Sequence, residues 1–319
     1  MKITHTHKLS YFMTFILLML ALLILMKPHS ASAAVKIGSA EDILLETYHR
    51  NGAGLEINSF GLPLVVESRE KDERVHVDVY GIFSYPFNNV VSALKVPANW
   101  CDIVALHPNI KACTYRQLPG DWQLTFYPGS KEYQPPEDTH PVMYTFRIVA
   151  QRQGYLDITL NAESGPFRTT DHRMRFEALP IDAGRTYIRI SYTYSDSIAL
   201  RLAAKIYFAT IARSKVGFSI TGTNKNGTPV YIGGPRGALE RSAVRYYCAI
   251  QTFMNTLSYP EEKQFTIRTG QWHDLTTRFR RQLFDLTKRD YLTTKTREHD
   301  NQVLLQQRIG TGMISRETK

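Results

Sequence analysis

An alternation of apolar and polar residues that starts at Val75 is the clearest pattern in the chain. Val75, Val77 and Val79 fall on one face of a predicted strand, and the residues between them fall on the other. Those residues include His76 and Asp78, and a histidine beside a carboxylate is typical of acid–base chemistry. Because the valines define the buried face, however, we expect both polar side chains to lie in solvent.

Two short helices and a succession of hairpins are predicted to follow this strand. Pro86 suits the first turn of a helix over residues 87–95, and Pro97 begins a second short helix. Turn signals then separate further strands, which together form an antiparallel meander. The predicted strands cover residues 112–117, 122–127, 143–151, 155–161, 173–179 and 185–194.

The C-terminal half is predicted to be mostly helical. Residues 198–212 form an Ala- and Leu-rich helix, residues 215–232 an added hairpin, and residues 239–257 a long helix. A charged tail follows, and it contains one amphipathic helix. The apolar stripe of that helix consists of Trp272, Leu275, Phe279, Leu283 and Leu286.

These elements together predict an α+β fold with a hollow sheet. A strongly twisted antiparallel sheet of this size curls and presents a concave apolar face. The long helix at residues 239–257 can close that face. Since the space between sheet and helix need not be filled by side chains, we expect a cavity for an apolar guest.

The first 33 residues have the organisation of a secretory signal. Lys2 and Lys8 precede an uncharged apolar run over residues 12–26, and Ala31-Ser32-Ala33 supplies a small-residue cleavage site. The run is short for a membrane span, which needs about 20 residues. We therefore favour cleavage after Ala33 over an uncleaved N-terminal anchor, and we expect the mature chain in the periplasm.

Net charge and export together narrow the classes of partner. Removal of Lys2, Lys8 and Lys27 with the signal lowers the formal net charge from +10 to +7. A basic protein can bind nucleic acid, anionic lipid or acidic polymers. For an exported protein we expect no nucleic acid partner, whereas anionic lipid head groups remain a candidate.

The chain has three cysteines, of which two are close in sequence. Cys101 and Cys113 can close a small loop in an oxidising compartment, so we predict a disulfide between them. Cys248 lies in an apolar helical stretch and is expected to be a buried thiol. No C-x-x-C pair and no zinc-ligand spacing occurs, so we expect neither a metal nor another cofactor.

One stretch of the chain resembles a known superfamily. Over residues 77–100 a strand leads through Tyr85-Pro86-Phe87 into a helix and then to Asn99-Trp100. With the meander and the closing helix, this stretch resembles the START-like (SRPBCC) superfamily of lipid-transfer proteins, plant allergens and polyketide cyclases. The resemblance spans residues 75–257 and implies a helix-grip fold with a hydrophobic ligand. It implies no universal catalytic residue.

The expected domain organisation follows from this resemblance. A signal peptide spans residues 1–33, an N-terminal helical extension 34–73, and a START-like domain 74–258. That domain departs from the family pattern by a helix and hairpin inserted at residues 195–237. An amphipathic helical tail spans residues 259–297, and residues 298–319 are expected to be disordered.

Tyr192 and Tyr194 are the first candidates for a ligand site. Both are in phase with Ile188 and Ile190, so they should point into the concave face. Tyrosine joins an apolar ring to a polar hydroxyl, and two inward hydroxyls could orient a ligand. The alternative is that both hydroxyls form hydrogen bonds inside a packed core.

Three arginines near the start of the closing helix are further candidates. Arg236 belongs to the glycine-rich turn at residues 233–237, where backbone N–H groups at a helix N-terminus attract anions; the alternative is a tight turn without a ligand. Arg241 and Arg245 are four residues apart and share a helix face. Directed inward they would need a carboxylate or a ligand anion. Otherwise they lie in solvent or pair with an acid such as Asp78.

Three functions are compatible with these features. The first is a non-enzymatic periplasmic binding or carrier protein for a lipid-like molecule. The second is an enzyme of polyketide cyclase or aromatase type, although no G-x-S-x-G, H-E-x-x-H or phosphate-binding loop is present. The third is a structural envelope protein with a filled cavity. The basic flanks of the tail helix either lie on an anionic membrane surface or face solvent from a docked helix.

Overall fold

The computed structural model describes residues 38–56, 60–196, 202 and 215–310. Two units are distinguished along the chain, Met1–Ser39 and Ala40–Lys319, and every helix and strand below belongs to the second. The predicted signal peptide lies outside the described residues, as does the predicted helix at 198–212 apart from the single position 202. None of the described helices is both long enough and apolar enough to cross a membrane.

Eight strands of the described chain form one open antiparallel sheet. Their order is β1-β2-β8-β7-β6-β5-β4-β3, so the β2–β8 pair alone joins strands that are distant in sequence. The hairpins predicted from the turn signals are therefore present. The strands are β1 (Leu64–Lys71), β2 (Arg74–Phe83), β3 (Ile110–Leu118), β4 (Asp121–Pro128), β5 (Val142–Arg152), β6 (Tyr155–Ser164), β7 (Thr170–Pro180) and β8 (Thr186–Ser195).

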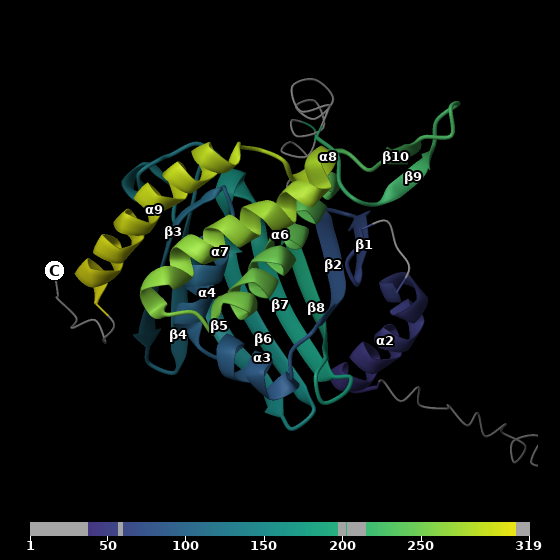
Figure 1. Ribbon diagram of the computed structural model, residues 1–319, viewed down its shortest axis with the longest axis horizontal. Helices are drawn as coiled ribbons and strands as arrows, with labels where there is room; N and C mark the ends of the chain where they lie inside the picture. Colours follow the sequence, from purple (N-terminus) through teal and green to yellow (C-terminus); the bar gives the residue numbers. More distant parts are fainter. Residues whose placement is uncertain (1–37, 57–59, 197–201, 203–214, 311–319) are drawn as a thin grey trace, which may run out of the picture. The chain divides into compact units, whose positions relative to one another are not determined.

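Helices cover the concave side of this sheet. Helices α3 (Phe87–Leu94) and α4 (Pro97–Val104) connect β2 to β3, with Pro86 and Pro97 at their starts as predicted. The long helix α6 (Gly234–Thr256) lies across the strands (Figure 1). A curved antiparallel sheet closed by one long helix is the helix-grip arrangement, which confirms the predicted α+β fold.

The two faces of the sheet have different surroundings. On the side of α6, here called the inner face, Val75, Val77 and Val79 are fully buried in the main apolar core. On the opposite side, the outer face, helix α2 (Ala40–Glu56) packs on tyrosines such as Tyr80 and Tyr187. The valine alternation therefore predicted the inner face correctly.

The outer face corrects one expectation. His76 and Asp78 do lie there, but Asp78 is only 2% exposed rather than solvated. Arg189 and Ser191 of the neighbouring strand β8 form hydrogen bonds to its carboxylate and cover it. Those two residues follow Asp78 by more than a hundred positions, so the alternation within β2 could not reveal them.

Gly81 lets the closing helix approach β2 closely. A Cβ atom at this position would lie 2.3 Å from Cε2 of Tyr247, whose ring fills the space that any other residue would need. Tyr247 is fully buried against the strand. The absence of a side chain at residue 81 therefore sets the distance between α6 and the sheet.

The tail differs from the prediction of one helix followed by disorder. It forms α7 (Glu261–Thr276), the short α8 (Arg280–Leu283) and α9 (Lys288–Ile309), so residues 298–309 are helical. Trp272, Phe279 and Leu283 of the predicted apolar stripe are buried in the main core. The stripe is thus used for docking on the domain, while the flanking basic residues are exposed.

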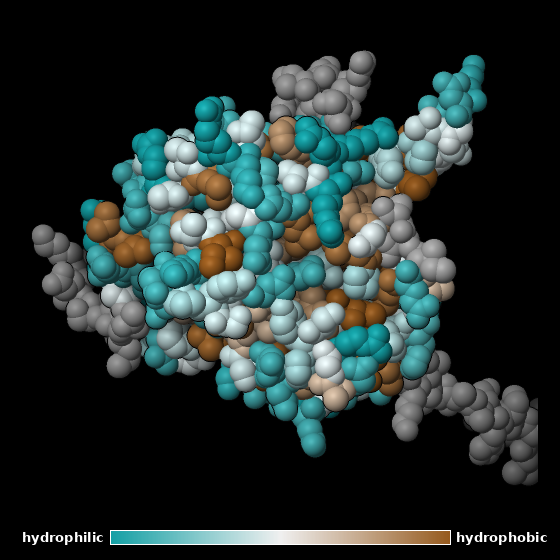
Figure 2. Space-filling model, in the orientation of Figure 1, coloured by the Kyte–Doolittle hydropathy of each residue, from teal (hydrophilic) through white to brown (hydrophobic). Residues whose placement is uncertain are grey.

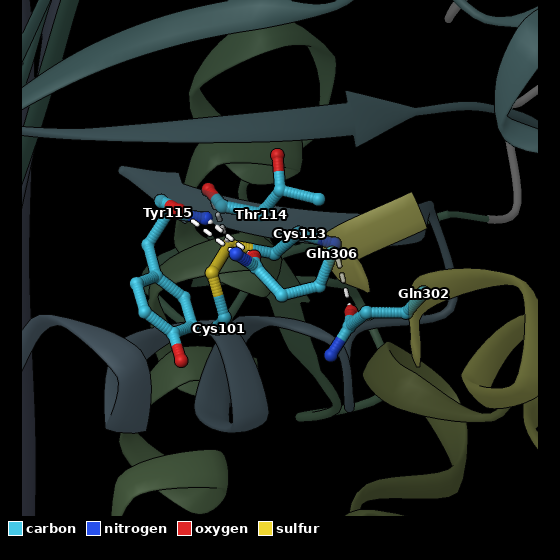
Figure 3. The surroundings of a disulfide bond; sticks show 6 residues. All are labelled: Cys101, Cys113, Thr114, Tyr115, Gln302 and Gln306. Atoms are coloured by element: carbon cyan, nitrogen blue, oxygen red, sulfur yellow. Dashed lines mark hydrogen bonds between the residues drawn. A yellow bond between two sulfur atoms is a disulfide. The ribbon is translucent and has the colours of Figure 1, made fainter. Parts of the chain in front are cut away.

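Helix α9 covers the outer edge of strand β3. Gln302 Oε1 accepts a hydrogen bond from Cys113 N at 2.7 Å, and Gln306 Oε1 accepts one from Tyr115 N at 2.9 Å (Figure 3). Deeper in this contact, one set of buried charges joins the helix to the strand. It consists of Lys111, Lys295 and Glu298.

The described part of the predicted insertion contains a small hairpin. Strands β9 (Ile220–Thr223) and β10 (Pro229–Tyr231) pair apart from the main sheet. Gly227 at the tip adopts φ +74°, a conformation that favours glycine. Asn226-Gly227 therefore forms the turn that this dipeptide predicts.

Candidate functional site

A group of polar side chains interrupts the apolar inner face. Tyr192 Oη and His172 Nδ1 are 3.1 Å apart, and Nε2 of the same histidine lies 2.7 Å from Thr169 Oγ1. The hydroxyl of Tyr144 forms a hydrogen bond with that of Tyr192. These four residues, from β5, β7, β8 and the loop before β7, are called the inner polar cluster below.

Burial keeps the inner polar cluster uncharged. It lowers the pKa of His172 to about 4, so the imidazole is neutral at pH 7 and donates from one nitrogen while it accepts at the other. Burial also raises the pKa of Tyr192 to about 12 and that of Tyr144 well above its ordinary value. Because Thr169 Oγ1 donates to Pro166 O, His172 donates from Nε2 to Thr169 and accepts from Tyr192 at Nδ1. Tyr192 in turn accepts from Tyr144. The hydroxyl hydrogens are thus used within the protein, and the cluster offers a ligand neutral hydroxyl oxygens that can accept.

Tyr194 completes the aromatic side of this cluster. Its ring stacks on His172 with a centroid distance of 5.5 Å and an interplanar angle of 15°, and it meets Tyr192 edge-on. Both tyrosines are half-buried and pack against the main core. The structure thus directs Tyr192 and Tyr194 inward, as their phase requires, and gives the hydroxyl of Tyr192 a partner within the protein.

Arg245 of α6 is buried and paired, but not with the acid that we expected. Its guanidinium contacts the carboxylate of Asp285, which lies between α8 and α9, whereas Asp78 is on the outer face of the sheet. Burial lowers the pKa of Arg245, and the charge of Asp285 opposes this effect. The same carboxylate also contacts Lys131 and Lys215. Arg241, one turn earlier, is 8% exposed and is likewise not solvated.

Near the start of α6, the carboxylate of Glu240 is held by residues 218 and 219. Glu240 is fully buried, and it accepts hydrogen bonds from Phe218 N at 2.6 Å and Ser219 N at 2.9 Å. Arg236 donates from Nε to Ser68 Oγ at 2.6 Å. Within residues 233–237, Gly237 N donates to Gly233 O at 3.0 Å, and Arg236 has a partner within the protein.

Several polar atoms on α6 lack the partners that burial normally demands. In the described part of the chain, Arg245 Nε, Tyr247 Oη, Gln251 Oε1 and Thr252 Oγ1 are buried without a hydrogen bond. A buried unsatisfied polar group costs about 1–3 kcal/mol. The closing helix therefore carries polar groups that a ligand or water molecules could satisfy.

The described residues enclose a small void between the sheet and α6. It has a volume of about 10 Å³, which is room for a single water molecule at most. A lipid does not fit there unless side chains or the helix move. The void is lined by Trp100, Ile103, Leu160, Met174, Arg175, Phe176, Ile190, Tyr246 and Ile250.

A disulfide fastens the helical layer to the sheet at its β3 edge. Cys101 of α4 and Cys113 of β3 are bonded, with Cα atoms 4.9 Å apart (Figure 3). Cys248 is a buried free thiol. Among residues that the structure describes, no three His, Cys, Asp or Glu side chains lie together as metal ligands.

The surface over the helical layer offers no large apolar area. Figure 2 shows this face as mostly hydrophilic, with hydrophobic residues in separate patches. Isolated exposed apolar residues are normal on a protein surface.

Comparison with known proteins finds similar structures but no match in sequence. No protein-family model and no curated protein matches the chain. The structure is similar to human StAR-related lipid transfer protein 5, with 9% identity, a TM-score of 0.35 and coverage of 69% of this chain and 98% of that one.

Two bacterial structures show a similar likeness. A START superfamily protein from Mycobacterium smegmatis has 13% identity and a TM-score of 0.28, with 43% of this chain and 92% of that one covered. The Zhui aromatase/cyclase from Streptomyces sp. R1128 has 12% identity and a TM-score of 0.28, with coverage of 39% and 70%.

Structural similarities with TM-scores this low do not indicate an activity. We therefore assign the fold from the order of the helices and strands in this chain. A strand, two short helices, an antiparallel meander and a long closing helix follow one another along the chain. The described part of the chain therefore has the helix-grip α+β fold, that of the START-like superfamily which it resembles.

Proposed function

We propose that this protein is a carrier that binds a lipid-like molecule between the sheet and α6. The observation that carries the proposal is the inner polar cluster, where the hydroxyl groups of Tyr144 and Tyr192 meet inside an otherwise apolar layer. A ligand with an apolar body and one polar end would place that end on these hydroxyls.

The charge of the cluster defines the polar end of the ligand. His172 is neutral and the two tyrosines stay protonated at pH 7. Arg245 is paired with Asp285, a carboxylate that it shares with Lys131 and Lys215. Since the tyrosine hydroxyl hydrogens are already donated within the protein, we expect the polar end of the ligand to donate a hydrogen bond, as an alcohol or a protonated carboxyl group does.

Binding requires α6 to move away from the sheet, because the void of about 10 Å³ holds no lipid. The unpartnered atoms Tyr247 Oη, Gln251 Oε1 and Thr252 Oγ1 favour such a movement. Each raises the free energy of the closed arrangement by about 1–3 kcal/mol, and each would be satisfied by water or ligand when the helix opens.

We place this carrier in the periplasm on the strength of its N-terminal sequence. The basic, apolar and small-residue segments before Ala34 are those of a cleaved signal. N-terminal sequencing of the mature protein should begin at Ala34. A full-length chain that stays in the membrane fraction would contradict this location.

Organic extraction of the purified full-length protein, followed by mass spectrometry, tests the carrier function directly. We expect a stoichiometric lipid in the extract, and we expect the delipidated protein to take up a fluorescent fatty acid. A protein that yields no lipid and takes up no apolar probe would have a permanently filled interior, and the proposal would be wrong.

A further inference from the structure

A second group of reactive side chains lies on the outer face, opposite the inner polar cluster. The strand register places Arg69, His76, Thr193 and Arg173 directly beside one another on β1, β2, β8 and β7. Directly paired residues on neighbouring strands share one face of the sheet. An imidazole and a hydroxyl group therefore stand between two guanidinium groups in one row.

Hydrogen bonds connect the hydroxyl group to a carboxylate through the imidazole. His76 Nδ1 contacts Thr193 Oγ1, and His76 Nε2 lies 2.7 Å from Asp78 Oδ2. An ionised carboxylate can only accept, so Nε2 carries the proton of the neutral ring and Nδ1 keeps a lone pair. That lone pair accepts the hydrogen of the Thr193 hydroxyl, which is the arrangement of a nucleophile beside its general base.

The carboxylate that orients the imidazole is rigidly held. Asp78 accepts from Arg189 Nε at 2.9 Å and from Ser191 Oγ at 2.5 Å. Burial acts to raise the pKa of Asp78, but the hydrogen bond from His76 and the charge of Arg189 outweigh it and hold the pKa well below its ordinary value. Asp78 is therefore ionised at pH 7 and fixes both the tautomer and the orientation of His76.

An open cleft of about 800 Å³ lies over this row, with His76 and Thr193 among the residues that line it. Arg74 in the cleft pairs with Asp171 at 3.1 Å. In the part of the chain that the structure describes, Lys71 and Arg173 pair with no carboxylate. The cleft therefore attracts anions to the hydroxyl group of Thr193. Its other lining residues are Arg69, Asp72, Glu73 and Ser195.

We propose that Thr193, His76 and Asp78 form a hydrolytic site for esters whose acyl group carries a carboxylate. Thr193 Oγ1 attacks the ester carbonyl while His76 Nδ1 takes the hydroxyl proton. The bond from the carbonyl carbon to the alcohol oxygen breaks, and the alcohol leaves with the proton from His76. Water then attacks the acyl-threonine, His76 takes its proton, and the acid departs as Thr193 regains its hydrogen. Arg173 binds the carboxylate of the acyl group.

Hydrolysis of 4-nitrophenyl hemisuccinate by the full-length protein tests this site, because release of 4-nitrophenolate is directly visible. We expect faster hydrolysis of this anionic ester than of neutral 4-nitrophenyl butyrate. Thr193→Val and His76→Gln should each lower kcat/KM by about 100-fold or more. Thr193→Ser keeps the hydroxyl group and should keep the activity. Arg173→Ala should raise KM for the anionic ester only.

Thr145→Val is the matched control, since Thr145 belongs to the same row of the sheet but lies two strands beyond Arg173. It should leave the rate unchanged. Mass spectrometry of the protein quenched during turnover should find succinyl on the peptide that contains Thr193. Acylation only elsewhere, or an equal rate in Thr193→Val protein whose circular dichroism and melting match wild type, would overturn the proposal. The Thr193→Val variant should still take up the fluorescent fatty acid as wild type does. Loss of hydrolysis with unchanged uptake therefore separates the hydrolytic site from the carrier function.

Discussion

Two histidines on opposite faces of one sheet are bonded to hydroxyl groups of adjacent residues in β8. His172 on the inner face bonds Tyr192, and His76 on the outer face bonds Thr193. The inner histidine has a second hydroxyl, Thr169, at its other nitrogen, whereas the outer one has a buried carboxylate. The same side chain is therefore a neutral hydrogen-bonding group on one face and an oriented base on the other.

The comparison shows that the partner at the second nitrogen decides the chemistry of an imidazole. Burial without a carboxylate lowers the pKa of His172 to about 4 and leaves it passive at pH 7. On the outer face, the carboxylate of Asp78 fixes one tautomer of His76 and aims its lone pair at Thr193. The inner cluster suits binding, and the outer row suits proton transfer.

Removal of the Asp78 carboxylate should have the largest effect on stability. Asp78→Asn breaks a buried ion pair with Arg189 and should lower the free energy of unfolding by about 3–5 kcal/mol. The matched inner change, His172→Asn, removes only neutral hydrogen bonds and should cost about 1–2 kcal/mol. Urea unfolding measures both values. A larger loss of unfolding free energy for His172→Asn than for Asp78→Asn would contradict this prediction.

The contributions of His172 and Asp78 to the free energy of unfolding should be lost in different pH ranges. Because burial lowers the pKa of His172 from 6.5 to about 4, the unfolded chain binds its proton first, and stability should fall between these values by up to about 3 kcal/mol. Asp78 has a pKa below its ordinary 3.8 when folded, so its contribution is complete above that value and is lost only at lower pH.

The measurement is urea unfolding of wild type and His172→Asn protein from about pH 7 to about pH 4. The wild-type protein should lose more stability over this range than the variant, because the variant has no imidazole to protonate at that position. Equal pH slopes for the two proteins would show that His172 is not desolvated.

Reduction of the disulfide should destabilise the fold while both histidine sites keep their geometry. The bond between Cys101 and Cys113 closes a short loop at the β3 edge, and its loss should cost about 2–4 kcal/mol. Melting of the protein with and without reductant measures the effect, and alkylation of the denatured but unreduced protein should label Cys248 alone. Two further reactive thiols in the untreated protein would show that the bond does not form.

Loss of a single inner hydroxyl group should have the smallest effect. Tyr192→Phe should weaken fatty acid binding by about 0.5–1.5 kcal/mol if the hydroxyl meets the ligand. Tyr127→Phe is a matched control, because Tyr127 alternates with the inward residue Phe126 on β4. A lower melting temperature with unchanged affinity would assign Tyr192 to the packed core instead.

Local signals were sufficient for most of the fold. The valines of β2, the proline before α3 and the glycine-rich turns are each readable within a few residues, and they predicted the strands, the helices and the face on which Tyr192 lies. The cysteine pair was likewise visible from its spacing. Such signals depend on the geometry of one strand or turn, which neighbouring residues determine.

The contacts that could not be predicted join residues far apart in sequence. Asp285 gave no sign that it would pair with Arg245, and Asp78 is covered by a strand that follows it by more than a hundred residues. Residues 298–309 looked disordered because the buried side of α9 is polar. Lys295, Glu298 and Gln302 become buried only because β3 supplies their partners.

Gln306 occupies the place that in a longer sheet belongs to another strand. Its amide accepts from the N–H of Tyr115 and donates to the carbonyl of the same residue, which are the two bonds that a neighbouring backbone would make. A free strand edge recruits segments from other molecules. The side chains of a polar helix thus end the growth of this sheet, and a chain without the part of α9 that carries Gln302 and Gln306 would present β3 as a template for self-association.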